Sequence, residues 1–280
     1  HEEAEWSVSE ILYRSSNVGT ILWAQEIGAS LLHNKLQKFG LGRKSELNFP
    51  GEANGILLPV EKWSGTSLPT IAIGQGVSVT PLQMLTAYAT LANRGLKPAP
   101  TLIRSMGNNV DMTFESLKTQ PERIIESQTA DSLVQIIETV VSSGTGRNAQ
   151  VPGYRVAGKT GTAWKPQLGG YGEEKEDRRY VVSFAGFFPV DDPEIVALVV
   201  VDEPSSNADS GGKAAAPIFA DFAKFAVRQL RIPSENEKID PTSSERVLAI
   251  TSIQAGLLNS FSSELPNNRF DEEVAGSLVE

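Results

Sequence analysis

A β-rich stretch in the second half of the chain limits the folds that this sequence can adopt. Three segments there carry alternating or continuous apolar residues at strand length, at residues 155–162, 180–188 and 194–202. The turn signal Asp191-Asp192-Pro193 separates the last two. The sequence therefore predicts that these two strands form an antiparallel hairpin.

A helix is predicted after these strands, over residues 215–230. We expect it to cover one face of the sheet through three residues on nearly one side of it, Phe219, Phe222 and Phe225. Helical periodicity dominates the earlier part of the chain, in segments that include 18–27, 30–39 and 127–141. Residues 41–79 read as loops with short strands, and a helix begins at Thr80-Pro81. Helices followed by strands and a covering helix predict an α+β or mixed α/β fold.

Composition and charge narrow the function classes. The chain has 280 residues, a formal net charge of −9 and no cysteine. An acidic chain without a basic face does not suit phosphate binding, so no nucleic-acid partner is expected. Disulfides and cysteine-based metal sites are excluded. No His/Asp/Glu cluster has metal-ligand spacing either, so neither a metal nor another cofactor is expected.

The domain organisation follows from a change in composition after Arg231. Residues 1–231 are predicted to form one domain. Residues 232–280 are rich in Ser, Glu, Asn and Pro, and we predict a mostly disordered tail. The longest apolar runs, such as 195–201, are strand-sized, well short of the roughly 18 residues of a membrane span.

The first candidate site motif is Gly158-Lys159-Thr160-Gly161-Thr162, at the end of a predicted strand. A phosphate-binding loop places its glycine-rich turn before Lys-Ser/Thr and a helix after it, so that interpretation fits poorly here. Taken alone, Lys-Thr-Gly is about as often structural as functional.

The second motif is Ser15-Ser16-Asn17, at a junction between two predicted helices. The first of these helices has Ser7 as N-cap and Glu10 at the capping-box position. Taken alone, Ser-Ser-Asn is typical of a helix boundary, because these side chains bond local backbone groups. Together the two motifs favour a functional site more than either does alone, because Ser-x-Asn comes first and Lys-Thr-Gly follows 144 residues later.

With its surroundings, this pair of motifs resembles the penicillin-binding proteins, whose sites combine Ser-x-x-Lys, Ser-x-Asn and Lys-Thr-Gly. The resemblance covers roughly residues 5–230 and is nearest to class B transpeptidases of the cell-division type. Outside the motifs it rests on segments 74–83, 92–95, 143–146, 183–189, 201–204 and 211–217. It implies a serine β-lactamase/transpeptidase-like fold, an antiparallel sheet covered by helices with a helical subdomain, incomplete at the N-terminus.

The resemblance implies a peptidoglycan D,D-transpeptidase, an acyl transferase acting on stem peptides that end in D-Ala-D-Ala, with β-lactams as mimics of that terminus. Ser15 would join a proton relay to the leaving amine, and the Asn17 amide would fix the donor peptide. Lys159 would hold Ser15 within hydrogen-bond range and attract the terminal carboxylate.

The residues after Lys159 are implied to bind substrate. The hydroxyls of Thr160 and Thr162 would bond the carboxylate, and Gly161 would let the peptide pair edge-on with the strand. The backbone N–H of Thr162 would supply half of an oxyanion hole.

No nucleophile is assigned within this chain. The family's Ser-x-x-Lys lies tens of residues before Ser-x-Asn, and only fourteen residues precede Ser15. The string Ser210-Gly211-Gly212-Lys213 comes after Lys-Thr-Gly, and Ser205-Ser206-Asn207 lies after a strand, so both are taken as coincidences. We therefore expect the C-terminal part of a longer enzyme, inactive by itself. Its upstream part would carry a membrane anchor at the extracytoplasmic face of the bacterial cytoplasmic membrane and bind division-complex membrane proteins.

Two alternatives remain open at this point. One is a non-catalytic, truncated binding or scaffold protein, and the other is a serine β-lactamase or penicillin sensor of the same fold.

Two further residues are given structural interpretations. Trp164 is expected to pack rather than to wall the cleft, and His33 is expected on the surface of its helix.

Overall fold

The structure is a computed structural model, and it describes residues 5–45, 47, 49–102, 121–168, 170–172 and 177–235. Its contacts divide the chain into two units, His1–Ile232 and Pro233–Glu280. Nearly all of the predicted tail lies outside the described residues. The account below therefore concerns the first unit.

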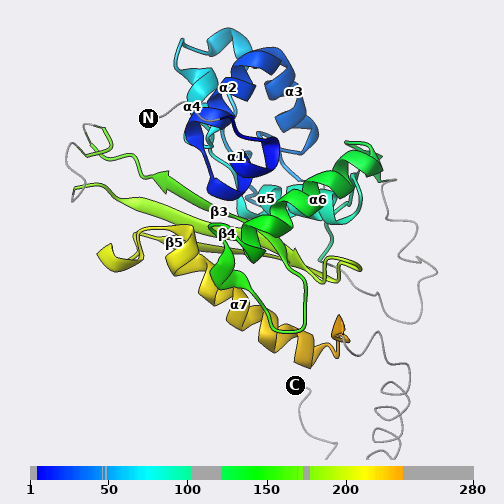
Figure 1. Cartoon of the computed structure of the whole chain (residues 1–280). Helices are drawn as coiled ribbons and strands as arrows, with labels where there is room; N and C mark the ends of the chain where they lie inside the picture. The colour runs from blue at the N-terminus through cyan, green and yellow to red at the C-terminus, as the bar shows by residue number, and fades with distance from the viewer. Residues whose placement is uncertain are drawn as a thin grey trace, which may run out of the picture. The chain divides into compact units, whose positions relative to one another are not determined.

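An antiparallel sheet with strand order β3-β4-β5 forms the centre of this unit (Figure 1). The strands are β3 (Ala157–Trp164), β4 (Tyr180–Phe188) and β5 (Ile195–Asp202). The predicted hairpin of the last two is confirmed. The predicted first strand is displaced by two residues, because the pairing of β3 with β4 begins at Ala157 and continues until Trp164 opposes Tyr180.

One face of the sheet is covered by α7 (Gly211–Gln229), which begins four residues before the predicted helix. The expectation for its phenylalanines is wrong for two of the three: Phe219 is fully buried, whereas Phe222 is 43% and Phe225 57% exposed. At 3.6 residues per turn, positions three and six residues on rotate progressively away from the sheet. The buried stripe instead combines Phe219 with small residues, Ala215, Ala216, Ala220, Ala223, Ala226 and Val227.

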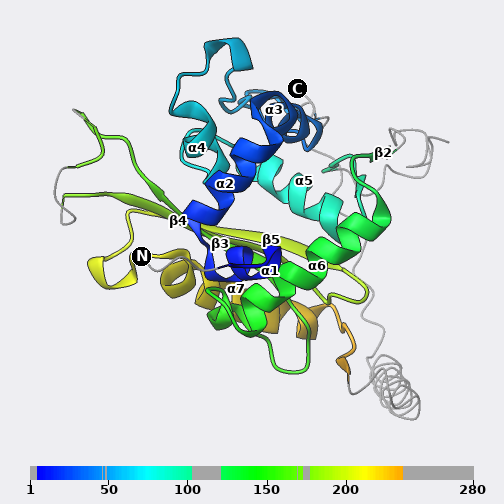
Figure 2. The same ribbon diagram turned by 45° about the horizontal axis from the view of Figure 1, so that its top comes forward.

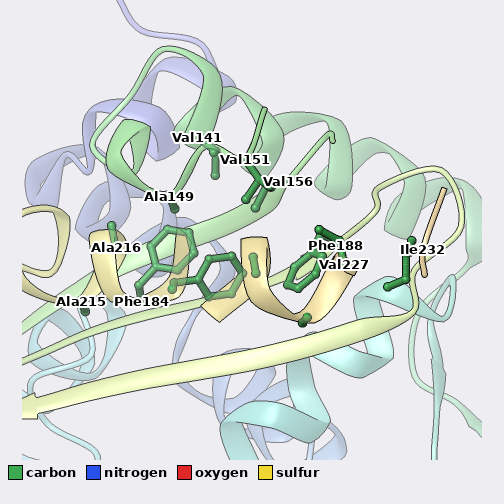
Figure 3. Packing of buried hydrophobic residues seen from close by; sticks show 13 residues of the cluster. Val141, Ala149, Val151, Val156, Phe184, Phe188, Ala215, Ala216, Val227 and Ile232 are labelled. Atoms are coloured by element: carbon green, nitrogen blue, oxygen red, sulfur yellow. The ribbon is translucent and has the colours of Figure 1, made fainter. Parts of the chain in front are cut away.

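The main hydrophobic cluster lies between this face and α7. Phe184 and Phe188 of β4 point toward the helix, and both pack edge-on against Phe219, with ring centroids 4.7 and 5.7 Å away. Val141, Ala149, Val151 and Val156 complete the same cluster from the segments before β3 (Figure 3). Edge-to-face aromatic packing adds about 1 kcal/mol per pair to the burial term, so this cluster fixes α7 against the sheet.

The opposite face is covered by α5 (Pro81–Ala92) and α6 (Ser127–Ser142). Phe187 and Ala157 of the sheet are buried against Ile137 of α6 and Leu91 of α5. The predicted start of α5 is confirmed, with a capping box between Thr80 and Gln83 and proline at its first position. The sheet thus has helices on both faces, and the structure confirms the α+β class.

Shorter helices pack beyond these layers. They are α1 (Val8–Arg14), α2 (Asn17–Ile27), α3 (Ala29–Lys38) and α4 (Ser67–Ala72). α1 packs against α6, whereas α2 packs against α3 and α4. Figure 2 shows α1 beside α6 with α2 leading away from the sheet, so the α1–α2 junction lies close to it. The first unit also contains β1 (Leu96–Lys97) paired with β2 (Glu122–Arg123), and the 3₁₀ turns η1 (Val60–Lys62), η3 (Arg147–Ala149) and η4 (Ser206–Ala208).

Two expectations for this helical region are wrong. The segment predicted as loops and short strands contains α4, whose six residues are too few to show a helical period. His33 is 8% exposed, not on the surface, because α3 packs against η1 and places its imidazole edge-on to Trp63 at 5.9 Å.

Candidate active site

The Ser15-Ser16-Asn17 motif forms a tight junction in which each residue has a different task. Ser16 is the N-cap of α2, and its Oγ accepts from the Gly19 N–H at 3.2 Å. Ser15 ends α1 in the left-handed conformation, with φ 56° and ψ 49°, a position that glycine usually takes. Its N–H donates to Leu12 O, and the Ser16 N–H donates to Ile11 O. The local backbone thus fixes Ser15 without using its hydroxyl.

Lys159 lies on β3 opposite this junction. Its Nζ donates to Ser15 Oγ at 2.9 Å and to the Thr160 carbonyl at 3.0 Å. Burial lowers the pKa of the Lys159 ammonium to about 8, because removal from water disfavours the charged form. No carboxylate of the described residues forms an ion pair with Lys159. The cation is therefore available to an anionic ligand.

The threonines flanking Gly161 lie near the start of α7, and the Thr160 hydroxyl also accepts from Lys159 Nζ at 3.4 Å. Thr160 Oγ1 shares a hydrogen bond of 2.9 Å with Thr145 Oγ1. Thr162 Oγ1 accepts from the Gly211 N–H, the first residue of α7, at 3.3 Å. Thr145 also donates its N–H to Tyr13 O of α1 at 3.4 Å. Thr145 therefore links the motif strand to the helix that ends in Ser15, a connection that sequence reasoning missed within the string Ser143–Gly146.

The glycines of the motif strand are required by close packing. A Cβ at Gly158 would lie 2.6 Å from the Phe184 ring and 2.7 Å from Ala185 O. A Cβ at Gly161 would lie 2.5 Å from Ser183 Oγ on the paired strand, and one at Gly211 would lie 2.6 Å from Gly161 O. A side chain at Gly158 or Gly211 would push β4 or α7 away from the strand that carries Lys159.

The outer edge of β3 is free along part of its length. β4 pairs with only one side of β3, and in an antiparallel strand the N–H and C=O of alternate residues point to the same edge. Gln75 bonds both the N–H and the C=O of Trp164, which places the backbone groups of Thr162 and Thr160 on that outer edge as well. The Thr162 N–H and C=O have no hydrogen-bond partner there among the residues that the structure describes.

The remaining predicted residues are placed as follows. Asn17 is the first residue of α2 and is exposed, and its amide makes no hydrogen bond within the described part of the chain. Trp164 is 41% exposed, with its ring 4.4 Å from the Arg178 guanidinium and 6.2 Å from Tyr171. Ser205–Asn207 lies in the η4 region after β5, and Ser210 is the N-cap of α7. Among the described residues, the side chain of Lys159 bonds to Ser15 and Thr160 and to neither of these serine strings.

The arrangement combines a proton-bearing hydroxyl, an adjacent cation and a free strand edge. Such a site can pair with an extended peptide, attract its carboxylate and transfer a proton next to the bound chain. The described residues contain no group of three His, Asp or Glu side chains placed to hold a metal ion. No helix in the described ranges is both long and apolar enough to cross a membrane.

Comparison with known proteins points to one family. The family model for the penicillin binding protein transpeptidase domain matches residues 1–224. Penicillin-binding protein PbpB of Mycolicibacterium smegmatis is 37% identical over 243 residues, which cover 83% of this chain and 37% of that protein. Stage V sporulation protein D of Bacillus subtilis is 32% identical over 277 residues, covering 96% of this chain and 42% of its own length.

Solved structures show the same fold. The transpeptidase domain of Burkholderia pseudomallei penicillin-binding protein 3 has a TM-score of 0.71 at 33% identity, covering 82% of this chain and 66% of that one. Penicillin-binding protein 3 of Mycobacterium tuberculosis complexed with ampicillin has a TM-score of 0.72 at 33% identity, covering 82% and 52%.

The chain spans about two fifths of the length of the curated relatives named here, and the match extends over most of its own length. The fold, the family model and the relatives agree on one assignment. The chain belongs to the penicillin-binding protein transpeptidase family, in its class B, cell-division type.

Proposed function

We propose that the protein containing this chain is a peptidoglycan D,D-transpeptidase that β-lactams inhibit. The observation that supports this most directly is the 2.9 Å hydrogen bond from Lys159 Nζ to Ser15 Oγ, beside the free edge of β3. Relatives support the activity by name, since the Escherichia coli protein at 30% identity is a peptidoglycan D,D-transpeptidase. The M. tuberculosis relative has been solved with ampicillin and with aztreonam, which supports β-lactams as ligands.

In the proposed reaction a serine Oγ attacks the carbonyl of the penultimate D-Ala and its proton passes to a base. The carbonyl oxygen becomes an oxyanion, for which the outward N–H of Thr162 is one suitable donor. The C–N bond then breaks and the terminal D-Ala leaves as its amine, protonated through a relay in which Ser15 takes part. The amine of a second stem peptide attacks the ester, restoring the serine and forming the cross-link.

The binding roles follow from the same geometry. Lys159 would attract the terminal carboxylate, and the exposed Asn17 amide has both a donor and an acceptor for the donor peptide. The Thr160 hydroxyl already bonds Thr145, and the Thr162 hydroxyl already accepts from Gly211. Either threonine can therefore bind the carboxylate only if its hydroxyl makes both contacts at once. Gly161 leaves the face beside Lys159 without a side chain.

The nucleophile would come from a Ser-x-x-Lys segment other than Ser210-Gly211-Gly212-Lys213. That string opens α7, and its Lys213 pairs with Asp209 at 2.9 Å, on an element that packs against the sheet. We further propose an extracytoplasmic location at the bacterial membrane and division-complex partners. Both follow from the family type, and co-purification of the full-length protein with membranes and with division proteins would test them.

Covalent labelling of the full-length gene product with fluorescent penicillin tests the function. We expect one stable adduct per molecule and slow release of the hydrolysed drug, because a transpeptidase keeps its acyl-enzyme until an amine arrives. The absence of an adduct would support a non-catalytic scaffold instead. Fast turnover of the drug would support a β-lactamase.

A further inference from the structure

The side chain of Gln75 forms two hydrogen bonds with the backbone of Trp164, the same pair that a residue on a neighbouring strand would form. Its Nε2 donates to the Trp164 carbonyl at 2.8 Å, and its Oε1 accepts from the Trp164 N–H at 2.9 Å. The two residues are 89 positions apart, and Gln75 lies in the turn between α4 and α5. One side chain therefore takes the place of a strand residue at the end of the free edge of β3.

The turn that carries Gln75 is fixed by its own backbone. The N–H groups of Gln75 and Gly76 both donate to Thr70 O, at 2.9 and 3.2 Å, at the end of α4. Gly74 has φ +82°, and a Cβ at Gly76 would lie 2.8 Å from Thr70 Oγ1. Glycine on either side of Gln75 therefore permits the turn, so the amide is presented to β3 in one arrangement.

The open part of the edge is short. From Thr160 to Trp164 the strand advances about 14 Å, at roughly 3.4 Å per residue. Lys159 Nζ already occupies the Thr160 carbonyl at 3.0 Å, and Gln75 occupies both groups of Trp164. The groups left for a peptide are the Thr160 N–H and the N–H and C=O of Thr162.

We propose that Gln75 is a specificity-determining residue that closes the edge of β3 and limits its strand pairing with a bound peptide to Thr160 and Thr162. The proposal rests on the proposed function, because Lys159 then attracts the terminal carboxylate and sets the direction of the peptide. The last residues of the stem pair with β3, and residues further upstream reach Gln75. They must turn away from the strand there.

The closure has a consequence for ligand length. In the unaltered protein, peptide residues upstream of the paired segment gain no backbone hydrogen bonds from β3. Gln75→Met keeps the length of the side chain and removes both hydrogen bonds, which frees the N–H and C=O of Trp164. A longer peptide then gains one further pairing position, whereas a short one gains nothing.

The test measures second-order acylation constants of the full-length protein with two thioester probes. Both end in D-Ala-D-thiolactate, one directly N-acetylated and one with two additional residues before that end. For the unaltered protein we expect similar constants for the two probes. For Gln75→Met we expect the ratio of long to short to rise about fivefold, the effect of about one additional net hydrogen bond.

The ratio of the long-probe to the short-probe acylation constant distinguishes a change in specificity from a general distortion of the site. A variant with a distorted site loses activity toward both probes alike. An unchanged ratio in a folded Gln75→Met protein overturns the proposal. If that variant does not fold, Gln75→Glu takes its place. It keeps an acceptor for the Trp164 N–H but loses the donor, and a ratio unchanged there also overturns the proposal.

Gln150→Met is the matched control, since Gln150 Nε2 likewise donates to the backbone carbonyls of Val141 and Ser142, away from β3. Its ratio is expected to equal that of the unaltered protein. If the unaltered protein is acylated by neither the probes nor penicillin, the proposed function fails and this inference fails with it. Acylation without a change of ratio contradicts the inference alone.

Discussion

The sheet with its covering helices and the helical region of α2–α4 are held in different ways. Phe184, Phe187, Phe188 and Phe219 are fully buried around the sheet. In α2 and α3, by contrast, several apolar side chains are exposed, with Leu22 of α2 59% and Leu31 of α3 49% exposed. Polar contacts to the sheet are made at the two ends of this region, from Ser15 before α2 to Lys159 and from Gln75 after α4 to Trp164.

Stability and site geometry therefore depend on separate sets of residues. The sheet is tightly packed and fixes Lys159, whereas Ser15 lies at the end of α1, which packs against α6, and its side chain reaches the sheet through one hydrogen bond. Changes in the buried cluster should therefore affect folding. Changes at the polar contacts should affect acylation with little effect on folding.

The largest effect is expected from Phe219→Ala, which should lower the free energy of unfolding by about 3–5 kcal/mol through lost burial and a cavity. Phe222→Ala is the matched control on the same helix, and because its side chain is 43% exposed it should cost below about 1 kcal/mol. Urea denaturation of the full-length protein measures both. Equal losses would show that α7 is not held through its Phe219 side.

Lys159→Met should leave folding intact and lower the rate of penicillin acylation about a hundredfold, the scale of losing one preorganised electrostatic contact. The change removes a buried charge, so the free energy of unfolding should not fall. Lys213→Met removes an exposed lysine of α7 and serves as the control, with acylation unchanged. A folded Lys159→Met protein with full acylation would contradict the assigned role of the cation.

Raising the pH should change acylation and stability in opposite directions, without a mutation. Because the pKa of Lys159 is lowered to about 8, its cation is lost above that pH, and acylation should fall by up to about tenfold per pH unit. The contribution of Lys159 to stability has the opposite sign. Between about 8 and its ordinary value of 10.5 the unfolded chain binds the proton more tightly, so this contribution rises with pH.

Acylation rates and urea midpoints measured across this pH range check both directions. Lys159→Met is the control for each, because it should remove the part of either profile that depends on this lysine. Profiles that remain identical in the variant would show that another group titrates.

The smallest effect concerns the left-handed backbone at Ser15. Ser15→Gly and Ser15→Ala both remove the hydroxyl that Lys159 contacts, so both should lower acylation to a similar extent. Glycine accepts φ 56° freely and alanine does not, so the glycine variant should be more stable by about 1 kcal/mol. Thermal unfolding compares the two, and equal stabilities would show that the conformation carries no strain.

Much of the architecture was predictable from the sequence. The hairpin of β4 and β5 follows from the turn signal between two apolar runs, and the start of α5 follows from Thr80-Pro81. The burial of α7 was not predicted correctly, because three phenylalanines outweighed the alanines that line the same helix. Small residues carry little hydrophobic signal, yet they allow a helix to lie close to a sheet.

The site was predicted through its two motifs, and the residues that hold it were not. Thr145 and Gln75 act through hydrogen bonds to residues 15 and 89 positions away in the sequence. A threonine in a turn and a glutamine between two glycines have no periodicity to reveal such partners. Their roles depend on which strand edge remains open.

The acyl transfer chemistry was implied by the resemblance to a known family, whereas the class of fold, the order of the motifs and their residue types could be read from the sequence. These depend on local periodicity, turn chemistry and the side chains themselves. The structure alone showed that Thr145 connects the motif strand to α1, that α7 turns Phe219 inward, and that Gln75 ends the open edge of β3. Each of these is a contact between distant segments, set by packing and by the satisfaction of backbone hydrogen bonds.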